Sequence, residues 1–234
     1  MRAGATGLIG FLVLALSAAV PASSRSVAGP PIPVGWKLDA SANGDLTGDG
    51  IADAAIVIRR ADPKRVIHND GLGTPELDTN PRRLLVFART ASGFSQIAAA
   101  DHLIPPAARE DSVCLEDPLS EGGISIRKHV LAVNLHYWLS CGSWGVTSNT
   151  YVFKWMASRF RLIGYDRMEF MRNSGEGEKV SVNFLTSRKT TTPFAIDDST
   201  PERLRWTRIK PQRHYLDAID LETCPAIDAK TYLC

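Results

Sequence analysis

Two hydrophobic patterns recur along the chain, and both predict β-strands. Residues 54–58 (AAIVI) form a continuous apolar run behind a turn, which is typical of a short strand buried on both faces. Residues 129–139 alternate instead, so that alternate side chains share one face of a strand. One face of that strand holds Leu131, Val133, Leu135, Tyr137 and Leu139, and the other holds Val130, Ala132, Asn134, His136 and Trp138.

Turn residues separate these runs at short intervals. Residues 84–98 predict a hairpin, with Gly93 available for a positive φ, whereas the Pro, Gly, Asn and Asp of residues 61–83 predict a long loop. Further strand runs occupy residues 124–127, 151–155, 160–165 and 179–185. Helix signals are confined to residues 199–204 and 214–223. The pattern predicts an all-β fold, an antiparallel meander of about ten short strands with one or two short helices.

The amino-terminal segment has the layout of a secretory signal peptide. Arg2 precedes the apolar stretch 7–20, and small residues follow, so cleavage is expected near residues 22–24. We therefore expect a signal peptide over 1–24, a Pro-rich linker over 25–34 and a single β-rich domain over 35–234. No other stretch is apolar for the roughly 18 residues that a spanning helix needs, so the mature chain is expected to be secreted or periplasmic without a membrane span.

The net charge of the chain bears on whether a nucleic acid is among its partners. The chain has 27 Lys and Arg against 25 Asp and Glu, a formal net charge of +2. Near-neutrality argues against a nucleic-acid partner. The basic clusters Arg82-Arg83 and 203–210 are accordingly interpreted as solvated strand faces.

Four cysteines, an even number in an exported chain, predict two disulfides. Three connectivities are open, and we favour the local pairs Cys114–Cys141 and Cys224–Cys234. Neither a Cys-x-x-Cys nor a Cys-and-His spacing supports the rival use of these cysteines in a zinc site.

Residues 45–53 (DLTGDGIAD) contain the motif with the most evident chemistry. Oxygen-bearing side chains stand at loop positions 1, 3, 5 and 9, Gly50 stands at position 6, and position 7 offers a backbone carbonyl. Calcium takes six to eight oxygen ligands, and this spacing wraps such oxygens around one point. The predicted ligands are Asp45, Thr47, Asp49, Ile51 (through its carbonyl) and Asp53. The alternative is an ordinary turn without metal, because Asp and Gly also dominate turns.

The loop and the apolar strand behind it resemble the FG-GAP or VCBS-type repeat family, whose hallmark is an Asp-x-Asn-x-Asp-Gly-x-x-Asp loop entering a strand. The resemblance covers residues 43–98 and is carried by Asp45, Asp49, Gly50 and Asp53; Thr47 departs from the usual Asn or Asp. It implies a structural calcium ion, strands arranged like a propeller blade, and a small exported bacterial protein. A single copy of the unit does not imply a complete propeller.

Motifs of catalysis are scarce. Residues 140–144 (SCGSW) lack the second Cys that a papain-type nucleophile needs, and the chain contains no Gly-x-Ser-x-Gly elbow and no His-Glu-x-x-His pair. The five histidines occupy no recognisable setting: His68, His102, His129, His136 and His214. His136, Trp138 and Trp144 suggest either an aromatic contact face or a face covered by a second layer, and we favour the second layer.

The sequence thus predicts an exported, non-enzymatic, β-rich binding or accessory protein with one structural calcium-type loop. Its partner could be another exported protein. The alternative from a different class is an exported hydrolase whose site is assembled from dispersed residues.

Overall fold

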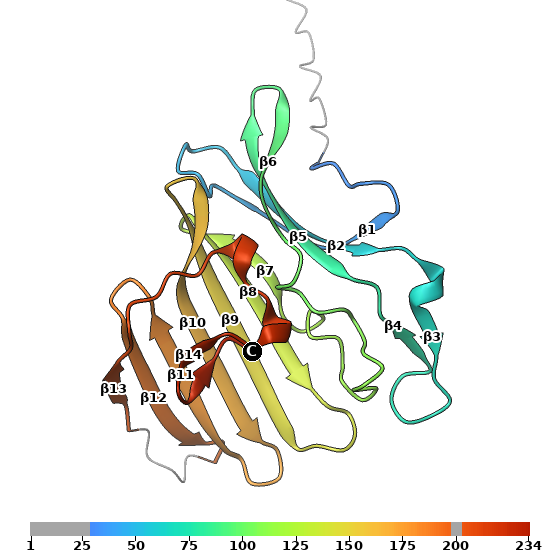
Figure 1. Cartoon of the computed structure of the whole chain (residues 1–234), viewed down its shortest axis with the longest axis vertical. Helices are drawn as coiled ribbons and strands as arrows, with labels where there is room; N and C mark the ends of the chain where they lie inside the picture. Colours follow the sequence, from blue (N-terminus) through green and yellow to red (C-terminus); the bar gives the residue numbers. More distant parts are fainter. Residues whose placement is uncertain (1–28, 198–202) are drawn as a thin grey trace, which may run out of the picture.

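Two antiparallel sheets make up most of the protein. The computed structural model describes residues 29–197 and 203–234 (Figure 1). A four-stranded sheet has the order β1-β2-β5-β6, and its strands are Trp36–Gly44, Asp53–Arg60, Arg82–Thr90 and Gly93–Ala100. Every neighbouring pair is antiparallel. The predicted all-β class is therefore confirmed.

The second sheet is an antiparallel meander of seven strands in the order β13-β12-β11-β10-β9-β8-β7. Its strands, from β7 to β13, are Gly123–Arg127, Val130–Trp138, Gly145–Met156, Arg159–Met171, Glu176–Asn183, Arg188–Ala195 and Arg205–Arg208. Consecutive strands are neighbours, and from β7 to β12 each is joined to the next by a loop of two to six residues, as the turn residues in the sequence predict.

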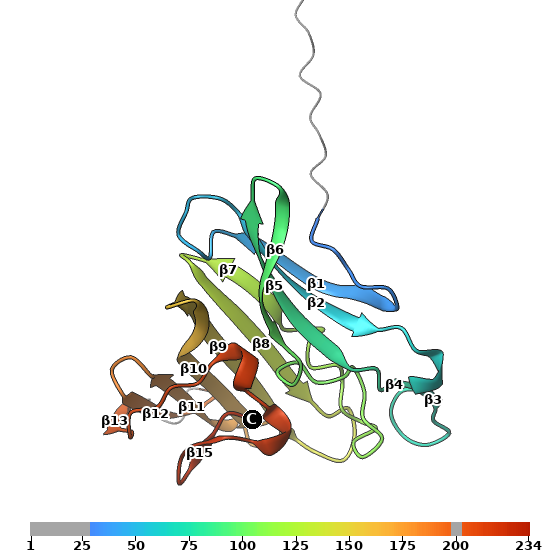
Figure 2. The ribbon, with the colours of Figure 1, turned by 45° about the horizontal axis from the view of Figure 1, so that its top comes forward.

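The core lies between the two sheets. Alternation places Leu131, Val133 and Leu135 of β8 on the inner face of the large sheet, where all three are fully buried. Edge strands β1 and β7 lie against each other (Figure 2). A Cβ on Gly44 of β1 would lie 2.6 Å from Cγ2 of Ile126, so only glycine permits this approach.

The outer face of the four-stranded sheet carries a second apolar cluster. It comprises Ile56, Ile58, Leu85 and Phe87, with Trp36, Phe94 and Ala99 packed against it. Because β2 is apolar on both faces, its continuous run is buried on both sides, as predicted from residues 54–58.

The carboxyl-terminal segment crosses the inner face of the large sheet (Figure 1). It contains the 3-10 turns η2 (Leu216–Ala218) and η3 (Leu221–Thr223) and the hairpin β14 (Ala226–Asp228) and β15 (Thr231–Tyr232). Tyr151 donates its hydroxyl hydrogen bond to the carbonyl of Leu233, and buried Lys189 donates to Asp228 and, at 2.9 Å, to Thr231 Oγ1. This segment therefore covers part of the inner face of the large sheet and contributes residues to the core.

Both predicted disulfides are present, Cys114–Cys141 and Cys224–Cys234. The first joins the segment before β7 to the β8–β9 loop, and the second ties the chain terminus to η3. Compared with the other two connectivities, these pairs close the shortest loops.

Several predictions of elements need correction or fall outside the described residues. The long loop expected over 61–83 holds η1 (Pro63–Arg65) and the hairpin β3 (Val66–His68) and β4 (Glu76–Asp78). The two main sheets hold eleven strands among the described residues, in agreement with the expected number of about ten. The additional strands β3, β4, β14 and β15 have only two or three residues each, too few to show alternation in the sequence. The turn or two of helix expected over 214–223 is present as the 3-10 turns η2 and η3. The signal peptide 1–24 and most of the 199–204 helix lie outside the described residues.

The linker expected over 25–34 falls only partly within the described residues, where residues 29–34 contain no helix or strand. In the part of the chain that the structure describes, no helix has the length and apolarity required to cross a membrane.

Candidate functional site

The Asp45–Asp53 loop is held together by its own carboxylates. Asp53 is fully buried, and its two carboxylate oxygens accept from the backbone N–H groups of Leu46, Thr47 and Arg89 at 2.8–2.9 Å. Asp53 thereby fixes the start of the loop to β2 and to the end of β5. Burying a carboxylate without partners costs free energy, and the three N–H donors offset much of that cost.

Asp45 plays the same role at the loop entrance. Its carboxylate accepts from Gly48 N at 2.6 Å and from Gly50 N at 2.9 Å, and Gly50 has the predicted positive φ, +82°. Desolvation raises the pKa of Asp45, but these hydrogen bonds and the nearby charge of His129, whose Nδ1 lies 3.4 Å from Oδ2, lower it overall. The carboxylate is therefore ionised at neutral pH.

The side chains of Asp49 and Thr47, two further predicted calcium ligands, make fewer hydrogen bonds within the loop than those of Asp45 and Asp53. Asp49 is exposed and accepts from Ile51 N at 2.8 Å. Thr47 Oγ1 is buried and has no hydrogen-bond partner within residues 29–197 and 203–234. Among residues 29–197 and 203–234, no three His, Cys, Asp or Glu side chains are grouped so as to hold a metal ion. The loop thus offers oxygen atoms around a turn, with one of them unsatisfied.

A larger feature is a cavity of about 690 Å³ between the two sheets, a size typical of small-molecule sites. Its floor is the inner face of the large sheet near the ends of β8, β9 and β10. Its walls come from residues 101–115, which join β6 to β7, and from η3 at the carboxyl terminus. Leu221 N donates to the carbonyl of His102 at 3.1 Å and joins these two walls.

The inner face of the large sheet changes character at this cavity. Along β9 it holds Phe153 and Tyr151 in the core, then Asn149 and Thr147 in the cavity lining. Asn149 is fully buried, and Arg167 is its direct partner on β10. Cross-strand partners have Cβ atoms about 5 Å apart, so these two polar side chains lie side by side.

Both side chains present an unsatisfied donor. Tyr165 donates to Asn149 Oδ1 at 3.1 Å, which directs the amide and leaves Nδ2 without a partner among the described residues. Arg167 Nη2 lies 3.3 Å from Glu169, while its buried Nε has no partner in the same part of the chain. A buried polar group without a hydrogen bond lowers the stability of the fold by about 1–3 kcal/mol. An acceptor bound beside these two donors would recover that free energy.

The charges around the cavity are nearly balanced. Arg82 is 4 % exposed and makes a bidentate pair with Asp117 at 2.6 Å, while its Nε donates to Asp39 at 2.7 Å. Desolvation raises the pKa of Asp117, but the hydrogen bonds from Arg82 and Leu119 N and the charges of Arg82 and Arg59 together lower it overall. Arg109 is likewise paired, with Asp111 at 2.8 Å. The cavity therefore offers neither a strongly positive nor a strongly negative field.

Tyr137 adds a hydroxyl to the lining, and burial raises its pKa to about 12. It is neutral at physiological pH and can donate one hydrogen bond.

The outer face of the large sheet carries a different arrangement. His136 Nδ1 lies 2.8 Å from Ser148 Oγ on the neighbouring strand, and His136 Nε2 lies 3.5 Å from Glu121 Oε2. The imidazole of His136 thus lies between the hydroxyl of Ser148 and the carboxylate of Glu121. Glu121 is 76 % exposed, and none of these three side chains lines the 690 Å³ cavity between the sheets.

Two interpretations of surface residues need correction. Arg82 is not on a solvated face, because it is buried by Asp39 and Asp117. The covering layer expected over the aromatic face is absent at Trp144, which is 58 % exposed. The guanidinium of Arg172 lies 3.9 Å from the ring centroid of Trp138 and 5.5 Å from that of Trp144. The carboxyl-terminal layer covers the opposite, inner face.

Asn149 and Arg167 are not among the site residues that the sequence predicts. The available signal was the polar stretch 145–150, which extends β9 beyond the alternating residues 151–155. Extending the strand puts Asn149 on the same face as Tyr151 and Phe153, where a buried amide is unusual. The partner strand and register that place Arg167 beside it could not be deduced from alternation alone.

Compared with protein-family models, with curated proteins and with solved structures, the chain matches none of them. The resemblance of residues 43–98 to FG-GAP or VCBS-type repeats stays a prediction based on the loop motif.

Proposed function

We propose that the protein is an exported, non-enzymatic binding protein whose ligand occupies the cavity between the sheets. The observation that carries the proposal is the pair of adjacent, buried and unsatisfied donors, Asn149 Nδ2 and Arg167 Nε, on the cavity floor. An acceptor oxygen of a ligand would satisfy both.

The chemistry of the lining favours a neutral, oxygen-rich ligand. Arg82, Arg109 and Arg167 each have a carboxylate partner, so a strongly charged ligand would gain little net attraction. Apolar Ile104, Leu115 and Leu221 line the same cavity. A small saccharide or a capped peptide, with hydroxyl or carbonyl oxygens and some apolar surface, fits this combination.

A thermal-shift panel tests the proposal. Glucose, maltose, N-acetylglucosamine and N-acetyl-dialanine-amide are compared with citrate and spermidine as charged controls. At least one neutral compound is expected to raise the melting temperature, because ligands that bind only the native state stabilise it.

A matched pair of variants locates the effect. Arg167→Lys keeps the positive charge and removes the Nε donor, and it should weaken binding about tenfold. Arg161→Lys is the control, because Arg161 lies on the same strand with an equally unsatisfied Nε but does not line the cavity. Equal stabilisation of both variants, or no response to any neutral compound, would contradict the proposal.

Calcium binding at the Asp45–Asp53 loop is a second proposal, favoured by the unsatisfied Thr47 Oγ1. The residues that would hold the ion are Asp45, Thr47, Asp49, Asp53 and the carbonyl of Ile51. Its role would be structural, since it would neutralise three carboxylates and hold the turn.

The calcium proposal predicts a dependence of stability on the ion. With a Kd of about 1 mM, 10 mM calcium would stabilise the protein by about 1.4 kcal/mol and raise the melting temperature by about 3–5 °C. Asp49→Ala should abolish the difference between calcium and chelator, whereas Asp70→Ala, at another exposed loop, should retain it. A difference that persists in Asp49→Ala would place the ion elsewhere.

The hydrolase alternative rests on Ser148, His136 and Glu121. It is weaker than the binding proposal because the group lies on an open sheet face and Glu121 is mostly exposed. It requires that 4-nitrophenyl acetate be hydrolysed by the wild type and not by Ser148→Ala; equal rates would reject it.

A further inference from the structure

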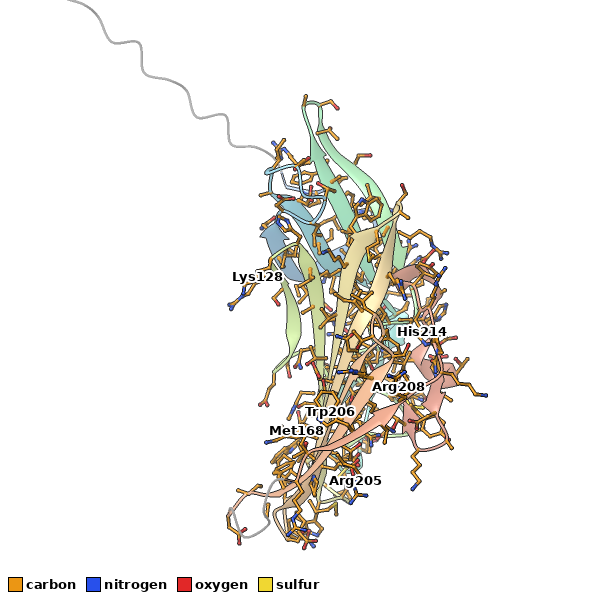
Figure 3. The ribbon with its side chains drawn as sticks, turned by 90° about the vertical axis from the view of Figure 1, so that its left-hand side faces the viewer. Lys128, Met168, Arg205, Trp206, Arg208 and His214 are labelled. Carbon is orange, nitrogen blue, oxygen red and sulfur yellow. A yellow bond between two sulfur atoms is a disulfide. The ribbon has the colours of Figure 1, made fainter. Side chains whose placement is uncertain are left out.

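Strand β13 forms one edge of the seven-stranded sheet, and all four of its residues, Arg205–Arg208, are exposed. In Figure 1 it lies at the outer left of the sheet, and Figure 3 looks onto this edge with Arg205, Trp206 and Arg208 labelled along it. Only β12 pairs with it among the described residues. Its free side is therefore open to another strand.

The backbone register identifies the free groups. Ile209 N donates to the carbonyl of Ser187 at 3.1 Å, so residue 209 points its backbone toward β12. Since backbone direction alternates along an antiparallel strand, Thr207 also points toward β12, whereas Trp206 and Arg208 point their N–H and C=O groups outward. Two residues thus offer a ladder of four unpaired backbone groups.

The side chains around this edge are cationic. Residues 203–210 (RLRWTRIK) contain four basic residues and no acid. Arg188, on neighbouring β12, has its guanidinium 6.0 Å from the ring centroid of Trp206. Neither Arg188, Arg205 nor Arg208 forms an ion pair with any described residue. Together with Thr207, Arg188, Trp206 and Arg208 line a shallow hollow of about 360 Å³.

Charge on an edge strand also protects a sheet from unwanted pairing. That explanation accounts for the arginines but not for Trp206, which is 61 % exposed, or for Leu204, which is 56 % exposed. Exposed aromatic and arginine side chains together are typical of the residues that dominate protein interfaces.

We infer that β13 is a docking edge for an extended, acidic segment of a partner protein, which adds as an eighth strand. The outward groups of Trp206 and Arg208 supply main-chain hydrogen bonds. Arg188 and Arg208 are direct cross-strand partners, so their side chains share one face of the sheet, where they bind carboxylates of the added strand. A nucleic acid or an anionic membrane would satisfy the charges but not the backbone ladder.

The test uses a synthetic ten-residue peptide of alternating Glu and Thr, titrated into the 15N-labelled protein. Backbone amide shifts are expected at Trp206 and Arg208. The same peptide, N-methylated at alternate residues, keeps its charge but cannot complete the ladder, and it should bind at least tenfold more weakly. Duplex DNA and vesicles with anionic lipid serve as probes of the other polyanions.

Two variants at one position separate charge from backbone. Arg208→Ala removes one charge, whereas Arg208→Pro also removes the outward N–H without breaking a bond to β12. Arg208→Pro should bind the peptide about fivefold more weakly than Arg208→Ala. Arg127→Ala, on the opposite edge strand β7, is the control and should bind as the wild type does.

The inference is overturned if the N-methylated peptide binds as tightly as the parent peptide, because charge alone would then explain binding. It is also overturned if the DNA or the vesicles bind while the peptide does not, or if Arg127→Ala weakens the peptide as much as Arg208→Ala. Retained dispersion of the amide spectrum shows that each variant is folded.

Discussion

The two sheets differ in which of their faces are packed with apolar side chains. The four-stranded sheet is apolar on both faces, with the main core on one side and the Ile56, Ile58, Leu85 and Phe87 cluster on the other. The seven-stranded sheet packs its inner face on the main core, and that face turns polar at Asn149 and Arg167. A sheet buried on both sides has little room for a site, whereas the polar end of the large sheet holds the cavity.

The largest expected difference concerns the outer faces. Ile58→Thr, in the fully buried outer cluster of the small sheet, should lower the free energy of unfolding by about 2–4 kcal/mol, since it removes apolar volume and buries a hydroxyl. Val152→Thr, on the half-buried outer face of the large sheet, should cost less than about 1 kcal/mol. Urea unfolding measures both, and equal losses would erase the distinction between the faces.

A second difference concerns how the inner face of the large sheet is covered. Lys189→Met removes the buried donor to Asp228 and Thr231 and should cost about 1–3 kcal/mol. Arg159→Met breaks the pair with Asp217, which is about half exposed on both sides, and should cost at most about 1 kcal/mol. Comparable losses in urea unfolding would mean that apolar contacts alone hold the carboxyl-terminal segment.

A smaller effect should appear as a pH dependence. The pKa of Asp117 is lowered in the folded protein, so its pairing with Arg82 contributes stability above the ordinary value of 3.8. That stability is lost as the pH falls below 3.8 toward the folded-state pKa. Asp117→Asn should be less stable at pH 7 and lose less on acidification; parallel curves in chemical unfolding from pH 6 to 2.5 would contradict this.

The smallest effect is expected at a polar cross-strand pair on the outer face of the large sheet. Asn134 donates to Thr150 Oγ1 at 2.8 Å across neighbouring strands. Asn134→Ala should cost about 0.2–1 kcal/mol, the range of a single cross-strand pair. A loss above about 2 kcal/mol in the same unfolding assay would show that this face is covered rather than solvated.

Periodicity predicted much of this fold because burial was uniform along the strands concerned. The apolar run 54–58 predicted a strand buried on both faces, and alternation assigned Leu131, Val133 and Leu135 to the core. The local disulfides were also predicted. Neither pattern specifies which strands share a sheet, so the division into four and seven strands required the structure.

The candidate site was less accessible from the sequence. Asn149 and Arg167 are 18 residues apart, and only the register of β9 and β10 makes them neighbours. The loop 45–53 was evident because its residues are contiguous, but the inward direction of Asp53 depends on Arg89, far along the chain. Contiguous motifs are therefore predictable, and sites made by strand pairing are not.

A high-resolution crystal structure of the protein with the neutral compound that stabilises it most would show whether Asn149 and Arg167 bind the ligand. One oxygen of that compound is expected within about 3.2 Å of both Asn149 Nδ2 and Arg167 Nε. A compound bound away from the cavity, or protein groups satisfying both donors, would contradict this expectation.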